Sequence, residues 1–249
     1  MLRFRSLSDV RWYLYRSATK LDMLYNQFAQ TSRRLTGNVS IEVPGLKASF
    51  GTPNDESPSV EEQWALVERE LRKRNLVGTI QEPKEYFAGK IPMRWGLFDD
   101  QGNRPQGDAP LVFFGGIDRA EEIIVGLGGS SVHVVGHEGA TSTYSRSTSP
   151  AIVSWILAGL ADAEPQCLWG DPEGERQQVL QGVAIALHYL RPPTLTLQFL
   201  AKTLLAGKIW GHEHMTGLST ARGLLGTPLY VCMVDPPGDE SRWGLDDQW

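Results

Sequence analysis

The chain of 249 residues has only two cysteines, Cys167 and Cys232, and no long apolar run. A disulfide scaffold needs more cysteines, and a chain of this length buries enough surface to be stable without them. Its longest apolar stretch, residues 151–161, is interrupted by Ser154 and Gly159, whereas about 20 apolar residues are needed to cross a bilayer. The N-terminal residues also lack the continuous apolar core of a secretory signal. These absences predict a cytoplasmic protein without a membrane segment.

Charge of one sign is not in large excess, since the formal net charge is −5. Its distribution is uneven: residues 1–34 carry seven Lys and Arg against two Asp, and residues 236–249 contain four carboxylates. A dedicated nucleic-acid-binding domain is usually basic overall, so the composition argues against nucleic acid as a partner. We expect one domain over residues 1–235, followed by an acidic C-terminal tail over residues 236–249.

Apolar residues recur at helical spacing in two segments of the first third of the chain. The first segment follows Ser17, a residue suited to cap a helix. The second opens on Ser59 and Glu62, which have the spacing of a capping box. Its apolar stripe consists of Val60, Trp64, Val67 and Leu71. Both segments are therefore predicted helices.

Between residues 91 and 137 the apolar residues alternate with others, which is typical of β-strands. Strands are predicted over residues 91–97, 111–114, 123–127 and 132–135. Pro92 indicates an edge position, and Gly128-Gly129 predicts the turn of a hairpin. The pattern therefore indicates an antiparallel meander around residues 90–137.

The pattern becomes helical again after residue 149. Helices are predicted over residues 149–161, 171–190 and 194–206, and a last strand over residues 229–234. Strands, then helices, then a returning strand are typical of an α+β fold. We expect an antiparallel sheet packed against several helices, with the C-terminal strand returning to the sheet.

Several segments resemble an uncharacterised actinobacterial family described only as a domain of unknown function. They are WYLYRSATKLDMLYNQ (residues 12–27), YFAGKIPMRWG (86–96), LVFFGGI and VGLGGSSVHVVG (within 111–136) and LLGTPLYVCMVD (224–235). Because these segments span most of the chain in order, the resemblance is global. It implies a single integrated domain and carries no activity or functional residue.

The glycine-rich segment over residues 126–131 is the first candidate site. Backbone N–H groups in a glycine turn can bind an anion, and serine hydroxyls add donors. The segment does not match G-x-G-x-x-G and does not open a helix, which argues against a dinucleotide-binding loop. A turn alone also explains glycine here, but the additional glycines favour close approach of a ligand to the backbone.

The predicted ligand-binding residues are Arg94, Gly128, Gly129, Ser130, Ser131 and His133. Arg94 would supply positive charge if its strand lies beside the glycine segment. Through these residues and neighbouring loops we expect a non-catalytic binding or regulatory domain that recognises a small anionic ligand or a protein partner. No cofactor is predicted.

A second class, a metal-assisted hydrolase, is left open by His212 and His214, which flank one glutamate. A metal site needs three or more ligands, and His133 and His137 would lie roughly 13 Å apart in a strand. We therefore predict no bound metal. If the chain is an enzyme, His212, His214 and a carboxylate are the expected catalytic groups.

Overall fold

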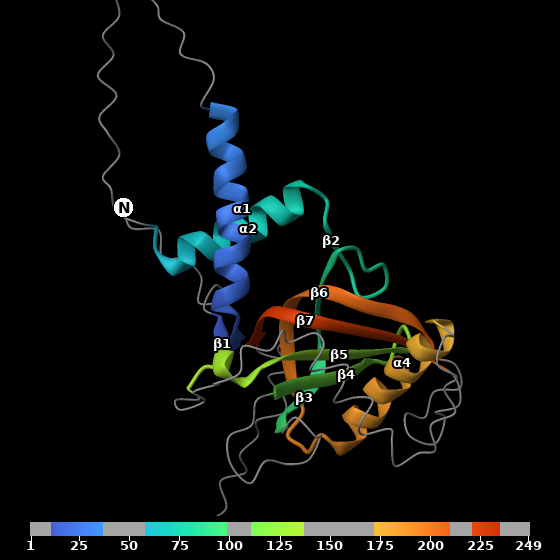
Figure 1. Cartoon of the computed structure of the whole chain (residues 1–249). Coiled ribbons are helices and arrows are strands. Elements are labelled where there is room, and N and C mark those ends of the chain that lie inside the picture. The colour runs from blue at the N-terminus through green and yellow to red at the C-terminus, as the bar shows by residue number, and fades with distance from the viewer. Residues whose placement is uncertain (1–10, 37–57, 99–110, 137–171, 210–220, 235–249) are drawn as a thin grey trace, which may run out of the picture. The chain divides into compact units, whose positions relative to one another are not determined.

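A computed structural model describes residues 11–36, 58–98, 111–136, 172–209 and 221–234 (Figure 1). The chain divides into two compact units, Ser17–Leu76 and the rest, and each is described by itself. The single domain expected over residues 1–235 stays a prediction. The helix predicted over residues 149–161 lies outside the described residues, as does the acidic tail.

The first unit contains α1 (Ala18–Thr36) and α2 (Val60–Lys73), which confirms both predicted helices. The capping box is formed: the Glu62 N–H donates to Ser59 Oγ, and the Ser59 N–H donates to Glu62 Oε2 at 2.8 Å. The two helices contact each other. Their buried apolar side chains are Leu21, Leu24, Phe28, Trp64, Val67 and Leu71.

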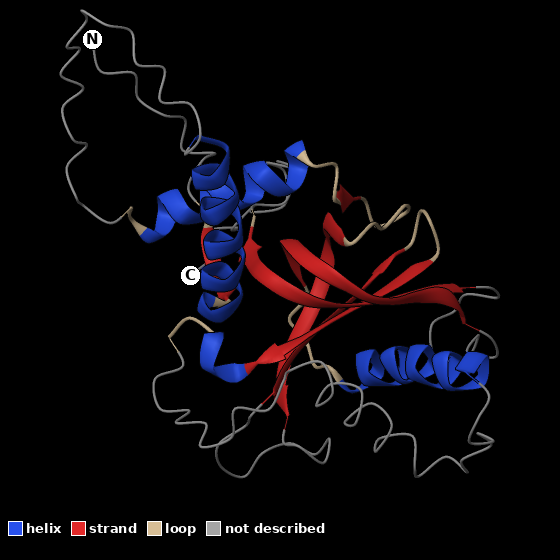
Figure 2. Ribbon diagram, turned by 45° about the horizontal axis from the view of Figure 1, so that its top comes forward, coloured by secondary structure: helices blue, strands red, loops and turns tan. Residues whose placement is uncertain are grey.

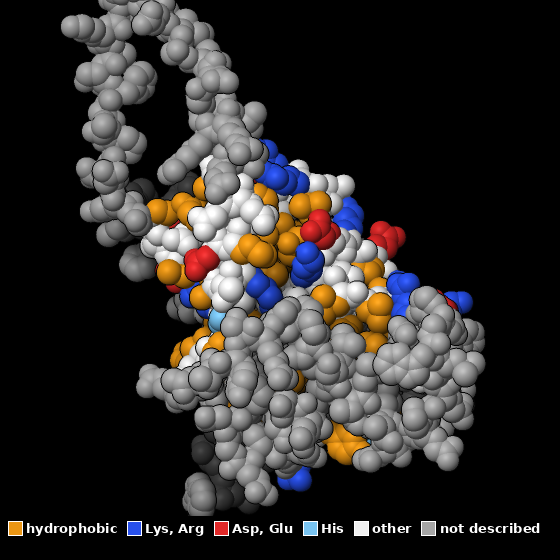
Figure 3. Space-filling model, in the orientation of Figure 1, with side chains coloured by type: hydrophobic (Ala, Val, Ile, Leu, Met, Phe, Trp, Pro, Cys, Tyr) orange, Lys and Arg blue, Asp and Glu red, His pale blue; other side chains and the backbone are white. Residues whose placement is uncertain are grey.

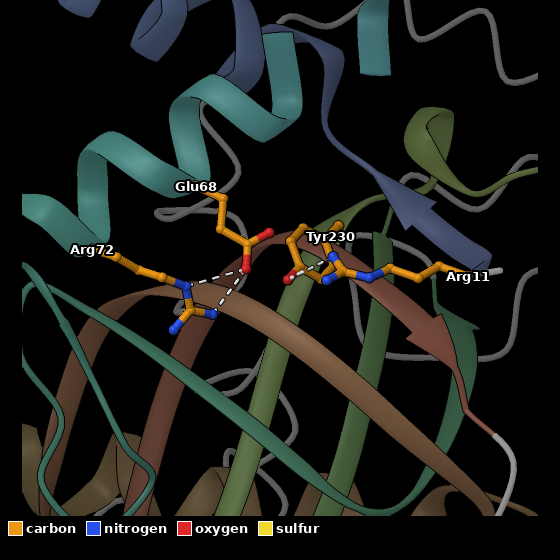
Figure 4. Close-up of polar contacts among 4 residues, drawn as sticks. All are labelled: Arg11, Glu68, Arg72 and Tyr230. Carbon is orange, nitrogen blue, oxygen red and sulfur yellow. Dashed lines mark hydrogen bonds and ion pairs between the residues drawn. The ribbon is translucent and has the colours of Figure 1, made fainter. Parts of the chain in front are cut away.

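The basic residues at the end of α2 are paired within their own helix. Arg72 donates to Glu68 at 2.8 Å (Figure 4). Lys73 and Arg74 each lie 3.7 Å from a Glu70 carboxylate oxygen. These surface pairs contribute little stability, and positive charge at this end also suits the helix dipole. Local helix electrostatics therefore accounts for this charge run.

The second unit is built on a seven-stranded sheet. Its strands are β1 (Trp12–Arg16), β2 (Val77–Gly78), β3 (Tyr86–Phe98), β4 (Leu111–Asp118), β5 (Ile123–Ser130), β6 (Leu195–Ile209) and β7 (Ala221–Met233). A 3₁₀ turn, η2 (Ser131–His133), follows β5, and helix α4 (Pro172–Tyr189) precedes β6.

Five of these strands close into a barrel (Figures 1 and 2). Going round the ring, β3 pairs with β4, β4 with β5, β5 with β7, β7 with β6, and β6 again with β3; the β5–β7 pair alone is parallel. Closure depends on β3, whose residues 86–93 pair with β6 and whose residues 93–98 pair with β4. The edge position predicted from Pro92 is wrong, because β3 pairs with β4 and β6; Pro92 itself is paired with β6, and the β4 pairing begins at the next residue.

The α+β class is confirmed, but the antiparallel meander is only part of the sheet. Strands β3, β4 and β5 are consecutive antiparallel neighbours, whereas β6 and β7 complete a mixed, closed barrel. The C-terminal strand does return to the sheet, where β7 pairs with β1, β5 and β6. The helix predicted over residues 194–206 is wrong, because this segment belongs to β6. Its apolar residues at positions 197, 200, 201 and 204 also have helical spacing, and this pattern favoured a helix over a strand.

The position of Gly226 shows which side of the strands is the interior. A Cβ on Gly226 of β7 would lie 2.6 Å from the Phe87 ring of β3, and these strands are not neighbours in the ring. The two residues therefore meet across the barrel. Other side chains on this side fill the space, among them Met93, Phe114, Val125, Leu127, Phe199 and Val231. The interior is a packed core, as expected of a small barrel.

Helix α4 covers the outward side of the barrel strands (Figure 2). Each barrel strand places one glycine beneath this helix; we call the set Gly96, Gly115, Gly126, Gly207 and Gly223 the glycine track. A Cβ at any of these positions would lie 3.3 Å or less from a side chain of α4 or from Leu190, which follows it. The missing side chains therefore allow the helix to approach the sheet closely.

The glycine track predicts that Gly207→Ala destabilises the protein. The new Cβ would lie 2.9 Å from Leu180 Cδ1, with the next atom at 3.7 Å. In an unobstructed strand, alanine is favoured over glycine by about 0.5–1 kcal/mol. Overpacking costs about 1–3 kcal/mol, so we expect a net loss of about 1 kcal/mol in urea unfolding.

Leu180→Val supplies the matched background, because valine lacks the obstructing Cδ1 atom. Gly207→Ala should be neutral or stabilising in that background, with a coupling of about 0.5–3 kcal/mol between the two sites. Equal destabilisation in both backgrounds would show that Leu180 is not the obstacle.

A second prediction concerns Lys20 in α1, whose pKa is lowered by burial from 10.5 to about 8. Between these two values the unfolded chain binds more protons than the folded one, so stability should rise with pH. Urea unfolding from pH 7.5 to 9.5 should show this rise. The range stops there because burial and Glu85 raise the pKa of Tyr86, whose ionisation would oppose folding at higher pH.

Lys20→Met is the matched variant, since methionine has a long unbranched side chain like that of lysine but carries no charge. It should be more stable than the natural sequence at pH 7 and should lose the rise toward pH 9.5. A rise of the same size in both proteins would assign the effect to another group.

Candidate functional site

The predicted glycine hairpin is not a turn. Gly128 and Gly129 lie within β5, opposite Phe113 and Val112 of β4. The β4–β5 connection is instead at residues 119–122, before the first residue of β5. The hairpin prediction is wrong, because both glycines are strand residues and neither has the positive φ of a turn.

Packing accounts for two glycines of the candidate segment. A Cβ on Gly129 would lie 2.5 Å from the Tyr15 hydroxyl, and a Cβ on Gly126 would lie 2.7 Å from Val183 of α4. Side chains of the protein thus fill the space beside these glycines, where the sequence analysis predicted a ligand. The additional glycines are therefore not evidence for close approach of an anion.

Arg94 is held by the end of α4. Its Nε donates to Thr194 Oγ1 at 3.1 Å, and its Nη1 donates to the carbonyl oxygen of Leu190 at 3.3 Å. Strand β4 separates β3 from β5, so the strand of Arg94 does not lie beside the glycine segment. The structure therefore does not bring Arg94 together with Gly128 and Gly129, and the guanidinium satisfies a carbonyl at a helix end.

The other three predicted residues lie where β5 ends. Ser130 is its last residue, Ser131 begins η2, and the His133 ring meets the Tyr15 ring edge to face at 5.8 Å. The strand predicted over residues 132–135 is wrong. These residues form a turn closed by the Val134 N–H, which donates to the carbonyl of Ser131 at 2.9 Å, and a single bridge joins Val134 to Tyr15.

The Ser131 side chain is completely buried. Within the part of the chain that the structure describes, its hydroxyl has no hydrogen-bond partner. A buried unpaired hydroxyl costs about 1–3 kcal/mol. This polar atom is therefore unfavourably placed in the conformation seen here.

A series of aromatic rings extends from this turn through the barrel core. Beyond His133 and Tyr15, the Tyr15 ring contacts Phe114 edge to face at 6.1 Å, and Phe114 stacks on Trp95 at 6.0 Å. Trp95 is half-buried. These contacts join β1, β3, β4 and η2. Sequence reasoning missed the series because no local spacing relates Tyr15 to Phe114.

Three apolar side chains near the same turn are exposed. The exposed fractions are 69% for Trp12, 38% for Val132 and 58% for Val135. The Val135 N–H donates to the carbonyl of Leu14 at 2.9 Å, so the turn adjoins β1. We call these three residues the Trp12 patch. Single exposed apolar residues are ordinary; these three lie on segments that the Val135–Leu14 hydrogen bond joins.

Two arginines of the basic N-terminal region have packing roles. The Arg11 guanidinium lies 5.6 Å from the centre of the Tyr230 ring and donates to its hydroxyl at 3.4 Å (Figure 4). Arg16 lies 4.5 Å above Tyr13. On the face in Figure 3, positive and negative side chains of the described residues are interspersed. Whether nucleic acid is a partner stays a prediction.

The metal prediction is not decided by these residues. No group of three metal-ligating side chains occurs among the described residues, and His212 and His214 lie outside them. The hydrolase alternative therefore stays a prediction. None of the described helices is long and apolar enough to cross a membrane.

The molecule is thus an α+β protein built on a closed five-stranded barrel, with a helix across the outward side of the strands. The chain belongs to the family of unknown function DUF7019, which matches residues 11–235. This match confirms the resemblance to a domain of unknown function, while the actinobacterial source stays a prediction. No curated protein and no solved structure gives a significant match.

The contacts of Arg94 predict that Arg94→Gln lowers stability by about 1 kcal/mol, because two hydrogen bonds at the end of α4 are lost. Urea unfolding measures the change. Lys90→Gln is the matched control, since Lys90 is an exposed cation of the same strand. If both variants unfold like the natural protein, Arg94 does not stabilise the helix end and its predicted role in binding regains support.

Proposed function

We propose that the protein is a non-catalytic binding domain whose Trp12 patch recognises a protein partner in the cytoplasm. The observation that carries the proposal is the joint exposure of Trp12, Val132 and Val135 on adjoining segments. Burial of such side chains at an interface is favourable by about 25 cal/mol per Å². Tryptophan is also enriched among the residues that dominate binding energy.

The anchor of this surface is held in place before binding. Trp12 is paired with Met233 of β7, and Tyr15 of the same strand is paired with Val231. Tyr15 is completely buried in the barrel core. A side chain presented by a paired strand loses less conformational freedom on binding than one in a loose segment. The position of Trp12 therefore supports a role in recognition.

A small anionic ligand was the other predicted target of this domain. Its support came from the additional glycines, from Arg94 and from the serines. Packing now accounts for Gly126 and Gly129, and Arg94 is bonded at the end of α4. The serines alone still favour an anion, so the protein partner is the better-supported target.

Trp12→Ser tests the proposal. Because Trp12 is largely exposed, the variant should keep the thermal midpoint of the natural protein to within about 2 °C. It should lose the partner that the tagged full chain retains in extracts of its own cells, as measured by quantitative mass spectrometry. Removing an interface tryptophan at a binding hot spot weakens affinity by at least about 30-fold.

Tyr189→Ser provides the matched control, because Tyr189 is also an exposed aromatic residue, at 66%, but ends helix α4. Partner retention should be unaffected in this variant. Sedimentation of both purified variants shows whether the partner is a second copy of the chain. Recovery of the same proteins by the natural chain and by both variants would rule out the Trp12 patch as the binding surface.

A further inference from the structure

Strands β3 and β6 and most of helix α4 carry positive charge without negative charge. Residues 86–98 and 176–209, which form these elements, contain six Lys and Arg but no Asp or Glu. The whole chain has the opposite excess, with 29 Asp and Glu against 24 Lys and Arg. These elements therefore lack the carboxylates that pair with cations elsewhere in the protein, as they do on α2.

Three of these cations are Lys90 and Arg94 of β3 and Arg191, the second residue after α4. Within the described part of the chain none of them has an ion-pair partner. Lys90 and Arg191 are exposed, and Arg94 is half-buried. Because Arg94 Nη1 donates to the Leu190 carbonyl at 3.3 Å, the backbone of Arg191 lies beside the Arg94 guanidinium. Neighbouring cations without a carboxylate attract anions.

Polar side chains accompany Arg94 on the same side of the sheet. Met93 faces the barrel core, so Lys90 and Arg94 face outward. On β6, Gln198 is paired with Lys90, and Thr194 Oγ1 accepts a hydrogen bond from Arg94 Nε at 3.1 Å. Arginine and lysine form charge-assisted hydrogen bonds with phosphate, and hydroxyl and amide groups add donors. The groups presented together here are therefore those that bind phosphate oxygens.

Arg94 is held in place and still has donors to spare. A guanidinium has five N–H donors in a planar fork, and two of them are used on Thr194 and on the Leu190 carbonyl. No described residue accepts a hydrogen bond from the other three. A side chain that is already oriented loses little conformational freedom on binding. The contacts that complete the helix end therefore also orient the guanidinium for an anion.

The cationic surface is small. Along β6 it ends at Leu200, which is completely buried, and beyond that residue Lys202 lies 3.7 Å from a carboxylate oxygen of Glu85. Lys90 and Arg94 are four residues apart in one strand, which places their Cα atoms about 13 Å apart. Proteins that bind nucleic acid through its backbone commonly make about 6–10 phosphate contacts. Three cations over this length suit a small ligand better than a nucleic-acid strand.

We propose that Arg94, Arg191 and Thr194 bind the phosphoryl group of a small phosphorylated ligand, and that Lys90 contacts a second anionic group of the same ligand. The site lies on the outward side of β3 and β6, at the end of α4. None of its residues belongs to the Trp12 patch, so its test is independent of the proposed function. It also differs from the site predicted from the sequence, because Arg94 acts with Arg191 and Thr194 instead of with the glycine segment.

Titration calorimetry of the full chain with inorganic pyrophosphate tests the proposal, at about 0.15 M salt so that long-range attraction is screened. The natural chain should bind one pyrophosphate and saturate. Arg191→Gln should weaken binding by at least about tenfold. Its thermal midpoint should not change, because no described residue pairs with Arg191. Lys208→Gln is the matched control: it removes one charge from an exposed lysine of β6, and it should bind like the natural chain.

Arg94→Lys separates an oriented site from charge alone. Lysine keeps the charge but lacks the planar fork, so pyrophosphate affinity should fall by about tenfold or more. The proposal is overturned if the natural chain shows no saturable binding, if Arg94→Lys binds like the natural chain, or if Arg191→Gln and Lys208→Gln have equal affinities. It is also overturned if a single-stranded oligonucleotide binds more tightly than pyrophosphate and Lys208→Gln weakens that binding, because the surface would then be one for nucleic acid.

Discussion

Helix α4 lies close to the barrel because every strand of the ring presents a glycine to it. Protein interiors are close-packed, so a methyl group on this track would press against a side chain of α4 or Leu190. The helix also lies in the connection from β5 to β6. Strand β6 then pairs with β3 and closes the ring. The covered outward side of the barrel depends on the contact between α4 and the glycine track.

This arrangement determines where recognition is feasible. Apolar side chains occupy the interior, and α4 packs on the outward side of β4 and β5. The glycines that suggested a ligand are used for internal packing, and Arg94 is used to complete a helix end. The proposed function therefore uses the junction of β1 and η2, where Trp12 lies on a strand paired with β7.

Much of the fold was predictable because its signals are local. The capping box at Ser59 and Glu62 forms within one turn of helix, so sequence spacing alone identifies it. The helix predicted over residues 171–190 is also present as α4, and the alternation beyond residue 91 identifies β3, β4 and β5. The helix predicted over residues 194–206 was wrong because the apolar residues of β6 at positions 197, 200, 201 and 204 also have helical spacing. The candidate site was predicted less well: Ser130, Ser131 and His133 do lie together at the end of β5, but Arg94 lies elsewhere, and Trp12 was not considered.

The sequence by itself determined the α+β class, two capped or amphipathic helices, three consecutive strands and membership of an uncharacterised family. Tertiary structure alone decided that the sheet closes, that β5 and β7 run parallel, and what each glycine is for. The reason is physical. A glycine in a turn and a glycine beneath a helix are identical in sequence, and they differ only in which distant atom occupies the place of the missing Cβ. At Gly126 and Gly129 those atoms belong to Val183 and Tyr15, more than 50 residues away in the first case and more than 100 in the second.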